Sequence, residues 1–315
     1  MMLTKSVWIP MMMMVAATTA GCAGDDESPP EESPKLRPGV EDSNQVYKGT
    51  PSAGESAFWV AVRGGDDAAL ATAVGKLKAD LAVDPTNGYS HFLVGASTFM
   101  PPSAALRALR DGTPLPDFDG PIATTALKDA LANLTDPFYL GFAGGLQASL
   151  EFAAGNFQEG GPRFALAMQH NRVATAFITV LGDLQMGDMA RAQEDMYAFL
   201  EYCNSGPLDR NGGDAVRFVE KANAGALAQR ECYSGYHAAH ASAGELLILA
   251  DLHAINGNAA AARKYYDAVQ SVSDYPTWPL KPLLERRRSG AQAAAANTVS
   301  AIANTCGTCH TNTLP

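Results

Sequence analysis

The chain has 315 residues, of which 47% are hydrophobic and 18% charged, and its mean hydropathy is −0.08. This length is enough for one large domain or two ordinary ones, with a sizeable core. Asp and Glu outnumber Lys and Arg by 33 to 23, and this acidic balance argues against a nucleic-acid-binding protein, whose contact surface is basic. Beyond the N-terminal segment, no apolar run approaches the length of about 18 residues that spans a bilayer.

The N-terminal segment has the pattern of an export signal. One positive charge, Lys5, precedes the uncharged residues 7–20, and small residues then lead to Cys22. This arrangement resembles a bacterial lipoprotein signal, in which the cysteine becomes the lipidated first residue of the mature protein. Thr19 departs from the family, which usually has an aliphatic residue there. We expect residues 1–21 to be a lipoprotein signal peptide; ordinary cleavage leaving Cys22 as a thiol is the alternative.

Residues 22–55 are polar, acidic and rich in proline. Such a segment buries too little apolar surface to fold, so we expect a disordered tether between a lipid anchor and the folded domain. In the lipoprotein family, an Asp directly after the cysteine often marks retention in the inner membrane. Ala23 stands there instead. The resemblance therefore implies an exported lipoprotein that faces the periplasm, in the outer membrane rather than the inner.

Residues 56–289 are predicted to be all-α, because apolar residues recur at spacings of three and four between Gly, Asn and Pro breaks. The clearest unit is 244–276. In it, Leu246 and Leu249 mark the apolar face of one helix, Gly257-Asn258 forms a turn, and a second helix follows. This unit resembles a tetratricopeptide repeat (TPR), which implies an α-solenoid of helical hairpins that binds peptides or proteins.

Other segments fit the same pattern. Turns are expected at Gly155-Asn156 and Gly187-Asp188, and the intervals between the turn glycines agree with a period near 34. Asp84-Pro85 is expected to end one repeat, and residues 204–215 are expected to form a loop insertion. The alternative is an irregular α-domain without a true superhelix.

The last residues carry the chemistry. Cys306 and Cys309 are three apart and His310 follows directly, which is the CxxCH pattern of c-type haem attachment. Two thiols at this spacing reach the two vinyl groups of one porphyrin, and the adjacent imidazole ligates the iron. We therefore expect one covalent haem c, with His310 as the proximal ligand.

Three other interpretations of these cysteines remain open: a dithiol redox pair, half of a zinc site, or an unstructured tail. The sequence shows no thioredoxin-like βαβ pattern, and no second CxxC or HxxxH stands nearby. Residues 290–315, an alanine-rich helical run that ends in the motif, resemble class II cytochromes c. In that family CxxCH also ends the last helix, and the resemblance favours a five-coordinate iron.

A sixth iron ligand has to come from earlier in the chain. His240 and His237 are three apart, so they lie near one helix face, in a segment expected to pack close to the C-terminal helix. Either one is a candidate distal ligand, with His240 slightly favoured. His253 is expected to be a packing residue, and an iron without a distal protein ligand is the alternative.

Cys203 and Cys232 are the two cysteines left over. In an oxidising compartment they are expected to close a disulfide, which would stabilise the fold by roughly 3 kcal/mol on the loop-entropy model; two buried thiols are the alternative. Residues 286–288 are three consecutive arginines. They are expected either to form a solvated helix end or to pair with haem propionates or an acidic partner.

Together these features predict an exported, lipid-anchored monohaem c-type cytochrome on a TPR-like scaffold. It would transfer single electrons at the cell envelope to a redox or scaffold protein partner, and it would not be an enzyme, because the phosphate-loop, hydrolase-elbow and zinc-protease motifs are absent. Two alternatives stay open: a TPR protein-binding scaffold in which haem is subordinate, and a haem-based sensor of small gases.

Overall fold

The alanine-rich, aromatic-poor composition favours helices, and helices are what the computed structural model contains. It describes residues 52–114, 124–170, 179–180, 183–184, 187–225, 240–273, 275–290, 305–311 and 314. Within these ranges the regular elements are α-helices and two short 3₁₀ helices, with no strand. The all-α prediction is confirmed for this part of the chain. The predicted signal peptide and Cys22 lie outside it.

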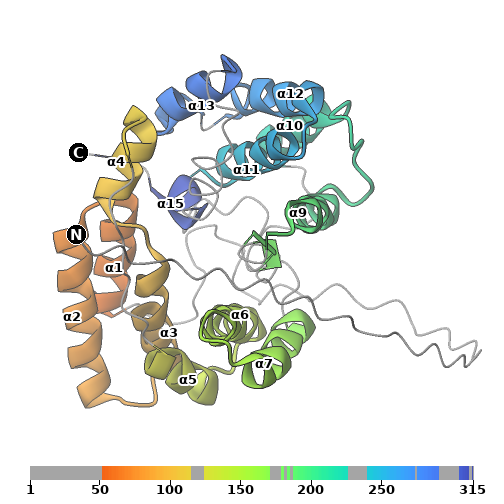
Figure 1. The fold of residues 1–315 in the computed structure, drawn as a ribbon. Coiled ribbons are helices and arrows are strands. Elements are labelled where there is room, and N and C mark those ends of the chain that lie inside the picture. Colours follow the sequence, from red (N-terminus) through yellow and green to blue (C-terminus); the bar gives the residue numbers. More distant parts are fainter. Residues whose placement is uncertain are drawn as a thin grey trace, which may run out of the picture. The chain divides into compact units, whose positions relative to one another are not determined.

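Figure 1 shows how the α-helices are arranged. In chain order, the helices are α1 (Ala53–Gly64), α2 (Asp67–Val83), α3 (Gly88–Ala96), η1 (Ser97–Phe99), α4 (Ser103–Asp111), α5 (Thr124–Asn133), α6 (Pro137–Ala153), α7 (Phe157–His170), α9 (Met189–Asn204), α10 (Ala215–Asn223), α11 (Ala241–Ile255), α12 (Ala259–Val269), η3 (Tyr275–Thr277), α13 (Lys281–Arg288) and α15 (Thr305–His310). None of the described helices is long and apolar enough to cross a bilayer.

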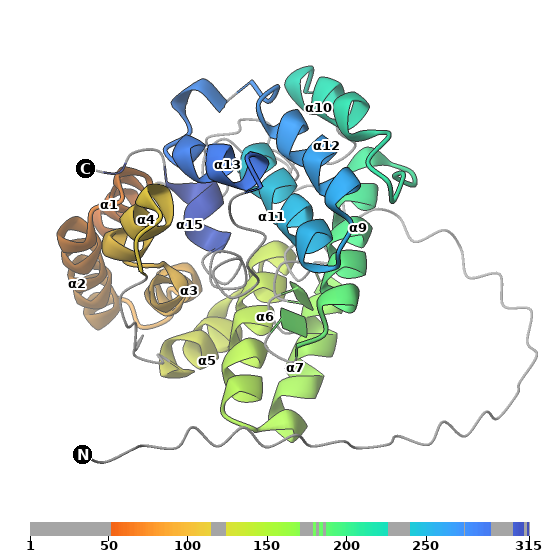
Figure 2. The same cartoon turned by 45° about the horizontal axis from the view of Figure 1, so that its top comes forward.

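All three predicted Gly-Asx turns are present. Gly155, Gly187 and Gly257 each have φ near +80°, the left-handed conformation that glycine adopts without steric cost. After each glycine, the next residue's amide donates to a carbonyl five residues back, as Asn258 does to His253 at 2.9 Å. This is the Schellman ending of a helix. Helices α6 and α7, and likewise α11 and α12, therefore lie side by side as hairpins (Figure 2).

Hairpin α1–α2 has the same turn at Gly65-Asp66, in addition to the three predicted turns. Its first helix begins at Ala53, inside the range predicted for the tether. The reason is a capping box: Ser52 Oγ accepts from the Glu55 amide at 3.1 Å, and Glu55 Oε2 accepts from the Ser52 amide at 2.9 Å.

Three other predictions concern the end of α2, the loop between α9 and α10, and the C-terminal helix. Helix α2 ends at Val83 with Asp84 as its C-cap, as predicted, and α3 follows from Gly88. Of the predicted loop insertion at 204–215, residues 205–214 connect α9 and α10, while Asn204 and Ala215 are the end residues of these helices. Of the predicted C-terminal helical run, residues 291–304 lie outside the described ranges, and α15 holds the motif itself.

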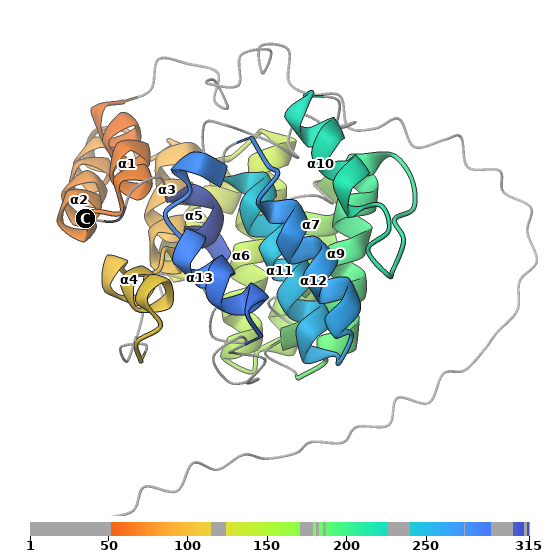
Figure 3. The same cartoon turned by 90° about the horizontal axis from the view of Figure 1, so that it is seen from above.

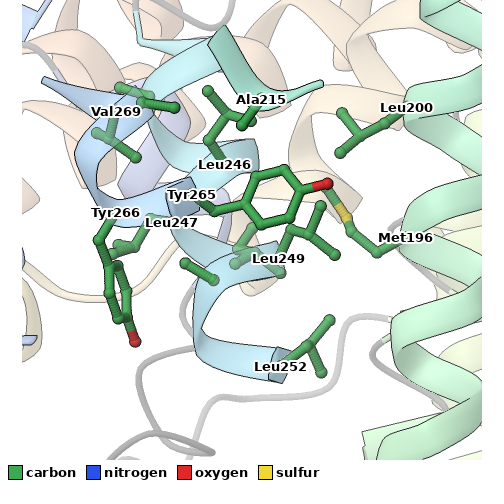
Figure 4. Packing of buried hydrophobic residues seen from close by; sticks show 14 of the residues in the cluster. Met196, Leu200, Ala215, Leu246, Leu247, Leu249, Leu252, Tyr265, Tyr266 and Val269 are labelled. Atoms are coloured by element: carbon green, nitrogen blue, oxygen red, sulfur yellow. The ribbon is translucent and has the colours of Figure 1, made fainter. Parts of the chain in front are cut away.

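The described residues build two main apolar cores. The first is formed by α1, α2, α3, α5 and α6, and the second by described residues between Val180 and Leu284, mainly on α9 to α13. In the second core (Figure 4), Met196 and Leu200 of α9 lie close to the ring of Tyr265, near Leu249 of α11. Helices α9, α11 and α12 are neighbours in Figure 3 as well.

Candidate haem-attachment site

The CxxCH motif lies on α15, the short helix Thr305–His310. The helix ends at His310, so both cysteine positions and the histidine fall within about two turns. Residues three apart on a helix share a face, which brings the Cα atoms of Cys306 and Cys309 to the same side of α15. The side chain of Cys306 lies outside what the structure describes; those of Cys309 and His310 lie within it.

Helix α11 holds α15 through the backbone and the thiol of Cys309. The amide of His240, the N-cap residue of α11, donates to the Cys309 carbonyl at 2.8 Å. Cys309 Sγ lies 3.9 Å from the Ala241 carbonyl oxygen, to which the thiol donates. Since the Cys309 side chain is only 7% exposed, the first turn of α11 fixes where this sulfur lies.

Gly244 makes this close approach possible. A Cβ atom on Gly244 would lie 2.4 Å from Cys309 Sγ and 3.2 Å from Thr308 Oγ1. Both distances are shorter than ordinary van der Waals contacts. The absence of a side chain at Gly244 therefore creates the space that the Cys309 sulfur fills.

Gly244→Ala should consequently displace α15 from α11. Overpacking of this kind typically costs about 1 to 3 kcal/mol of unfolding free energy, measurable by urea unfolding. Gly75→Ala is the matched control, because Gly75 lies in an exposed part of α2 with nothing within 4 Å of an added Cβ. Equal effects of the two substitutions would contradict the assigned packing role of Gly244.

Trp278 holds the next part of the motif. Its side chain is fully buried in the second core, and its Nε1 donates to the Thr308 carbonyl at 2.9 Å. Thr308 itself is 1% exposed. An indole N–H inside a core requires an acceptor, and here the acceptor is the carbonyl of Thr308, which lies between the two cysteines of the motif.

The first core meets the motif at His310. The Trp59 ring on α1 lies with its centroid 6.1 Å from that of the His310 imidazole, at an interplanar angle of 31°. Trp59 Nε1 donates to Tyr89 Oη at 3.0 Å, which fixes the indole on α3. Sequence reasoning missed this contact, and a separation of 251 positions leaves no local signal that could have revealed it.

The chain beyond α15 is held by α4. Arg110 Nη1 donates to the Leu314 carbonyl at 3.4 Å, and Leu314 packs against Leu106 and Leu109. Leu314 also borders the second core. The C-terminal segment therefore contacts helices from both ends of the described chain.

The donor set suits a c-type haem. A thiol and an imidazole stand on consecutive residues, and a second cysteine precedes them by one turn, which is the donor set of a c-type haem site. His310 is half-buried, so its imidazole is not enclosed by the core. In the described ranges, no group of three or more His, Cys, Asp or Glu side chains is gathered to hold a metal ion.

Of the two candidate distal ligands, the structure describes His240. The prediction that the His240 segment packs near the C-terminal helix agrees with the bond from His240 to the Cys309 carbonyl. The His240 side chain is 1% exposed, and its role as an iron ligand stays a prediction. His237 lies outside the described residues.

Of the two remaining cysteines, Cys203 lies within the described residues and Cys232 does not. Cys203 on α9 is disulfide-bonded and buried. Its predicted partner, Cys232, lies outside the described residues, so the pairing stays a prediction.

His253 is a core residue, as expected. Its Nε2 lies 2.7 Å from Tyr197 Oη, and its ring stacks on Tyr265 at an interplanar angle of 12°. Tyr265 Oη donates to the Asp209 carbonyl, so Tyr197 donates to Tyr265 and His253 Nε2–H donates to Tyr197. Burial, helped by the charge of Arg210, lowers the pKa of His253 to about 4.

The lowered pKa of His253 predicts that the folded protein loses stability in acid. An unfolded His253 binds a proton below its ordinary pKa of about 6.5 while the folded one stays neutral down to about 4, so stability is lost as pH falls through this window. His253→Gln keeps a donor to Tyr197 without titrating. Between pH 7 and about 4.5, its unfolding free energy should fall by about 2 kcal/mol less than that of the native chain. Parallel pH profiles in urea unfolding would contradict this account.

The three consecutive arginines all have partners within the protein, so the solvated helix end was wrong for two of them. Arg287 is buried against Asp251, and Arg286 donates to the Leu109 and Arg110 carbonyls at the end of α4. Arg288 pairs with Asp267 and Glu285 at the surface. Their positions follow from the packing of α13 against α4 and α12.

The chain was compared with protein-family models, with curated proteins and with solved structures, and none of them matches it.

Proposed function

We propose that the chain is an exported, lipid-anchored monohaem c-type cytochrome that transfers single electrons at the cell envelope. The observation that carries the proposal is the CxxCH motif on a terminal helix whose backbone and side chains are held by both cores. When bound, haem supplies an iron centre that takes one electron from a donor protein and gives it to an acceptor. Cys306 and Cys309 would hold it covalently, and His310 would be the proximal ligand.

The surroundings of the motif suit electron transfer. Trp278 and His240 hold the backbone of Thr308 and Cys309 by hydrogen bonds inside the protein. A ligand on such a backbone has little freedom to move when the charge of the iron changes. Axial ligand, burial and nearby hydrogen bonds are the means by which a protein sets a haem potential.

The scaffold and the anchor belong to the same proposal. Four helix-ending turns with the same Gly-Asx chemistry, at Gly65, Gly155, Gly187 and Gly257, support a TPR-like array. Such an array would dock the redox partner, or a scaffold partner with haem subordinate. The lipid on Cys22 would tether the domain to the periplasmic face of a membrane, the outer one favoured, through the segment 22–51.

Absorption spectra of the haem-loaded full-length chain test the electron-transfer role. A six-coordinate, low-spin spectrum that carbon monoxide leaves unchanged is expected for an electron carrier with a distal ligand such as His240 or His237. A high-spin spectrum that shifts with carbon monoxide would contradict this role and favour the small-gas sensor. His240→Ala and His237→Ala separate the two ligand candidates, since only loss of the true ligand produces the high-spin spectrum.

A further inference from the structure

Tryptophan is rare in this chain, and its positions are informative. The sequence has three tryptophans, and the two in the described ranges, Trp59 and Trp278, both contact α15. They come from different cores and lie 219 positions apart in the chain, at 59 and 278. Each meets a different part of the motif: Trp278 binds the backbone at Thr308, and Trp59 meets the side chain at His310.

Trp59 is itself firmly held. Its side chain is 6% exposed, and its Nε1 donates to Tyr89 Oη at 3.0 Å. Phe58 packs edge-on against it, with ring centroids 5.0 Å apart and an interplanar angle of 86°. Tyr89 is anchored in turn by Tyr139, at a centroid distance of 4.8 Å. The indole therefore has a fixed orientation that does not depend on α15.

The half-buried imidazole of His310 lies against this fixed surface. A centroid distance of 6.1 Å with a tilt of 31° is within the range in which aromatic rings attract one another. An apolar ring on one side limits rotation of the imidazole about its Cβ–Cγ bond.

We infer that Trp59, held by Tyr89, is a positioning residue that sets the orientation of the His310 imidazole. The inference rests on the proposed function, since the orientation matters for an imidazole that ligates iron. Trp278 is assigned a different task, the placement of the motif's backbone.

The first measurement uses the haem-loaded full-length chain. Acid removes an imidazole from iron by protonating it, and the midpoint of this transition is followed in the absorption spectrum. Trp59→Leu should weaken ligation by about two- to tenfold, as expected for the loss of an aromatic pair, which raises the midpoint by about 0.3 to 1 pH unit. Trp59→Phe should restore most of the loss, and Tyr89→Phe should produce a smaller shift.

Phe218→Leu is the control, because it removes a fully buried aromatic ring of α10 from the second core and leaves in place both the contact of Trp59 with His310 and the hydrogen bond from Trp278 to Thr308. It should lower the thermal midpoint of unfolding while leaving the acid midpoint of ligation within error of the native chain, measured where the protein remains folded. If Trp59→Leu lowers the thermal midpoint in the same way and leaves the acid midpoint unchanged, its role is only structural and the inference is overturned.

A second measurement needs no haem. In the full-length Cys306→Ser/Cys309→Ser chain, nuclear Overhauser effects should connect the ring protons of Trp59 and His310, and Trp59→Leu should shift the His310 ring resonances. Their absence would overturn the inference. A native chain that acquires no haem would overturn the proposed function instead, and the spectra of the haem-free chain would still decide the contact between Trp59 and His310.

Discussion

Arg287→Met should lower the free energy of unfolding by about 3 to 5 kcal/mol, the cost of leaving one member of a buried ion pair without the other. Arg287 Nε lies 3.4 Å from Asp251 Oδ1, and the two side chains are 2% and 1% exposed. Tyr266 Oη donates to the same carboxylate oxygen at 2.5 Å. Without the Arg287 guanidinium, the Asp251 carboxylate would keep the hydrogen bond from Tyr266 but lose its positive partner. Burial already disfavours the charged form of this carboxyl group.

The pH dependence of this loss has a definite sign. Burial raises the pKa of Asp251 to about 6, and Arg287 opposes that shift. Removing Arg287 should raise the pKa further, so the variant regains part of its stability as pH falls and the carboxyl is protonated. Urea unfolding at pH 8 and at about pH 5 measures both effects.

Arg288→Met is the matched control on the same helix. Its partners, Asp267 and Glu285, are about half exposed, and surface pairs of this kind contribute about 0 to 1 kcal/mol. If Arg287→Met and Arg288→Met cost the same, the buried pair does not stabilise the junction of α11 and α13 as described.

Trp278→Ala should be comparably damaging, at about 3 to 5 kcal/mol, because it removes a fully buried aromatic side chain from the second core. It also removes the donor to the buried Thr308 carbonyl, which lies between Cys306 and Cys309. We therefore expect a local effect in addition to the global one. Amide hydrogen exchange in residues 305–310 should accelerate under conditions in which α12 stays protected.

Tyr275→Ala serves as the control for this variant. Tyr275 lies next to Trp278, with ring centroids 6.3 Å apart, but is only partly buried. Its loss should cost clearly less stability and leave exchange in α15 unchanged. If both substitutions accelerate exchange in α15 equally, the bond from Trp278 to Thr308 is not what holds the motif.

The features predicted best from the sequence are those that depend on residues close together in the chain, such as turns and helix caps. The turns at Gly155, Gly187 and Gly257 were recognisable because only a few residue types end a helix in the left-handed conformation and begin the next with an Asx cap. The turn at Gly65-Asp66 has the same chemistry and is predictable in the same way. The capping box of Ser52 and Glu55 was the signal for where the helical domain begins.

Side-chain contacts between distant segments could not be predicted in the same way. The contact of Trp59 with His310 and the burial of Arg287 both depend on how helices pack, which leaves no periodic pattern in the sequence. A run of three arginines at a helix end usually favours solvent, and here the packing of α13 against α4 and α12 overrides that preference. The CxxCH spacing, in contrast, is local and needed no tertiary information.

Haem attachment is the claim on which the account of function depends, and one preparation tests it directly. The full-length chain is produced in a bacterium that has the c-type haem maturation machinery, and the purified protein is analysed by pyridine haemochrome assay and intact mass. We predict one covalently bound haem per chain, absent from a Cys306→Ser/Cys309→Ser variant produced in parallel. A colourless native chain, with no mass added at the C-terminal cysteines, would contradict the account.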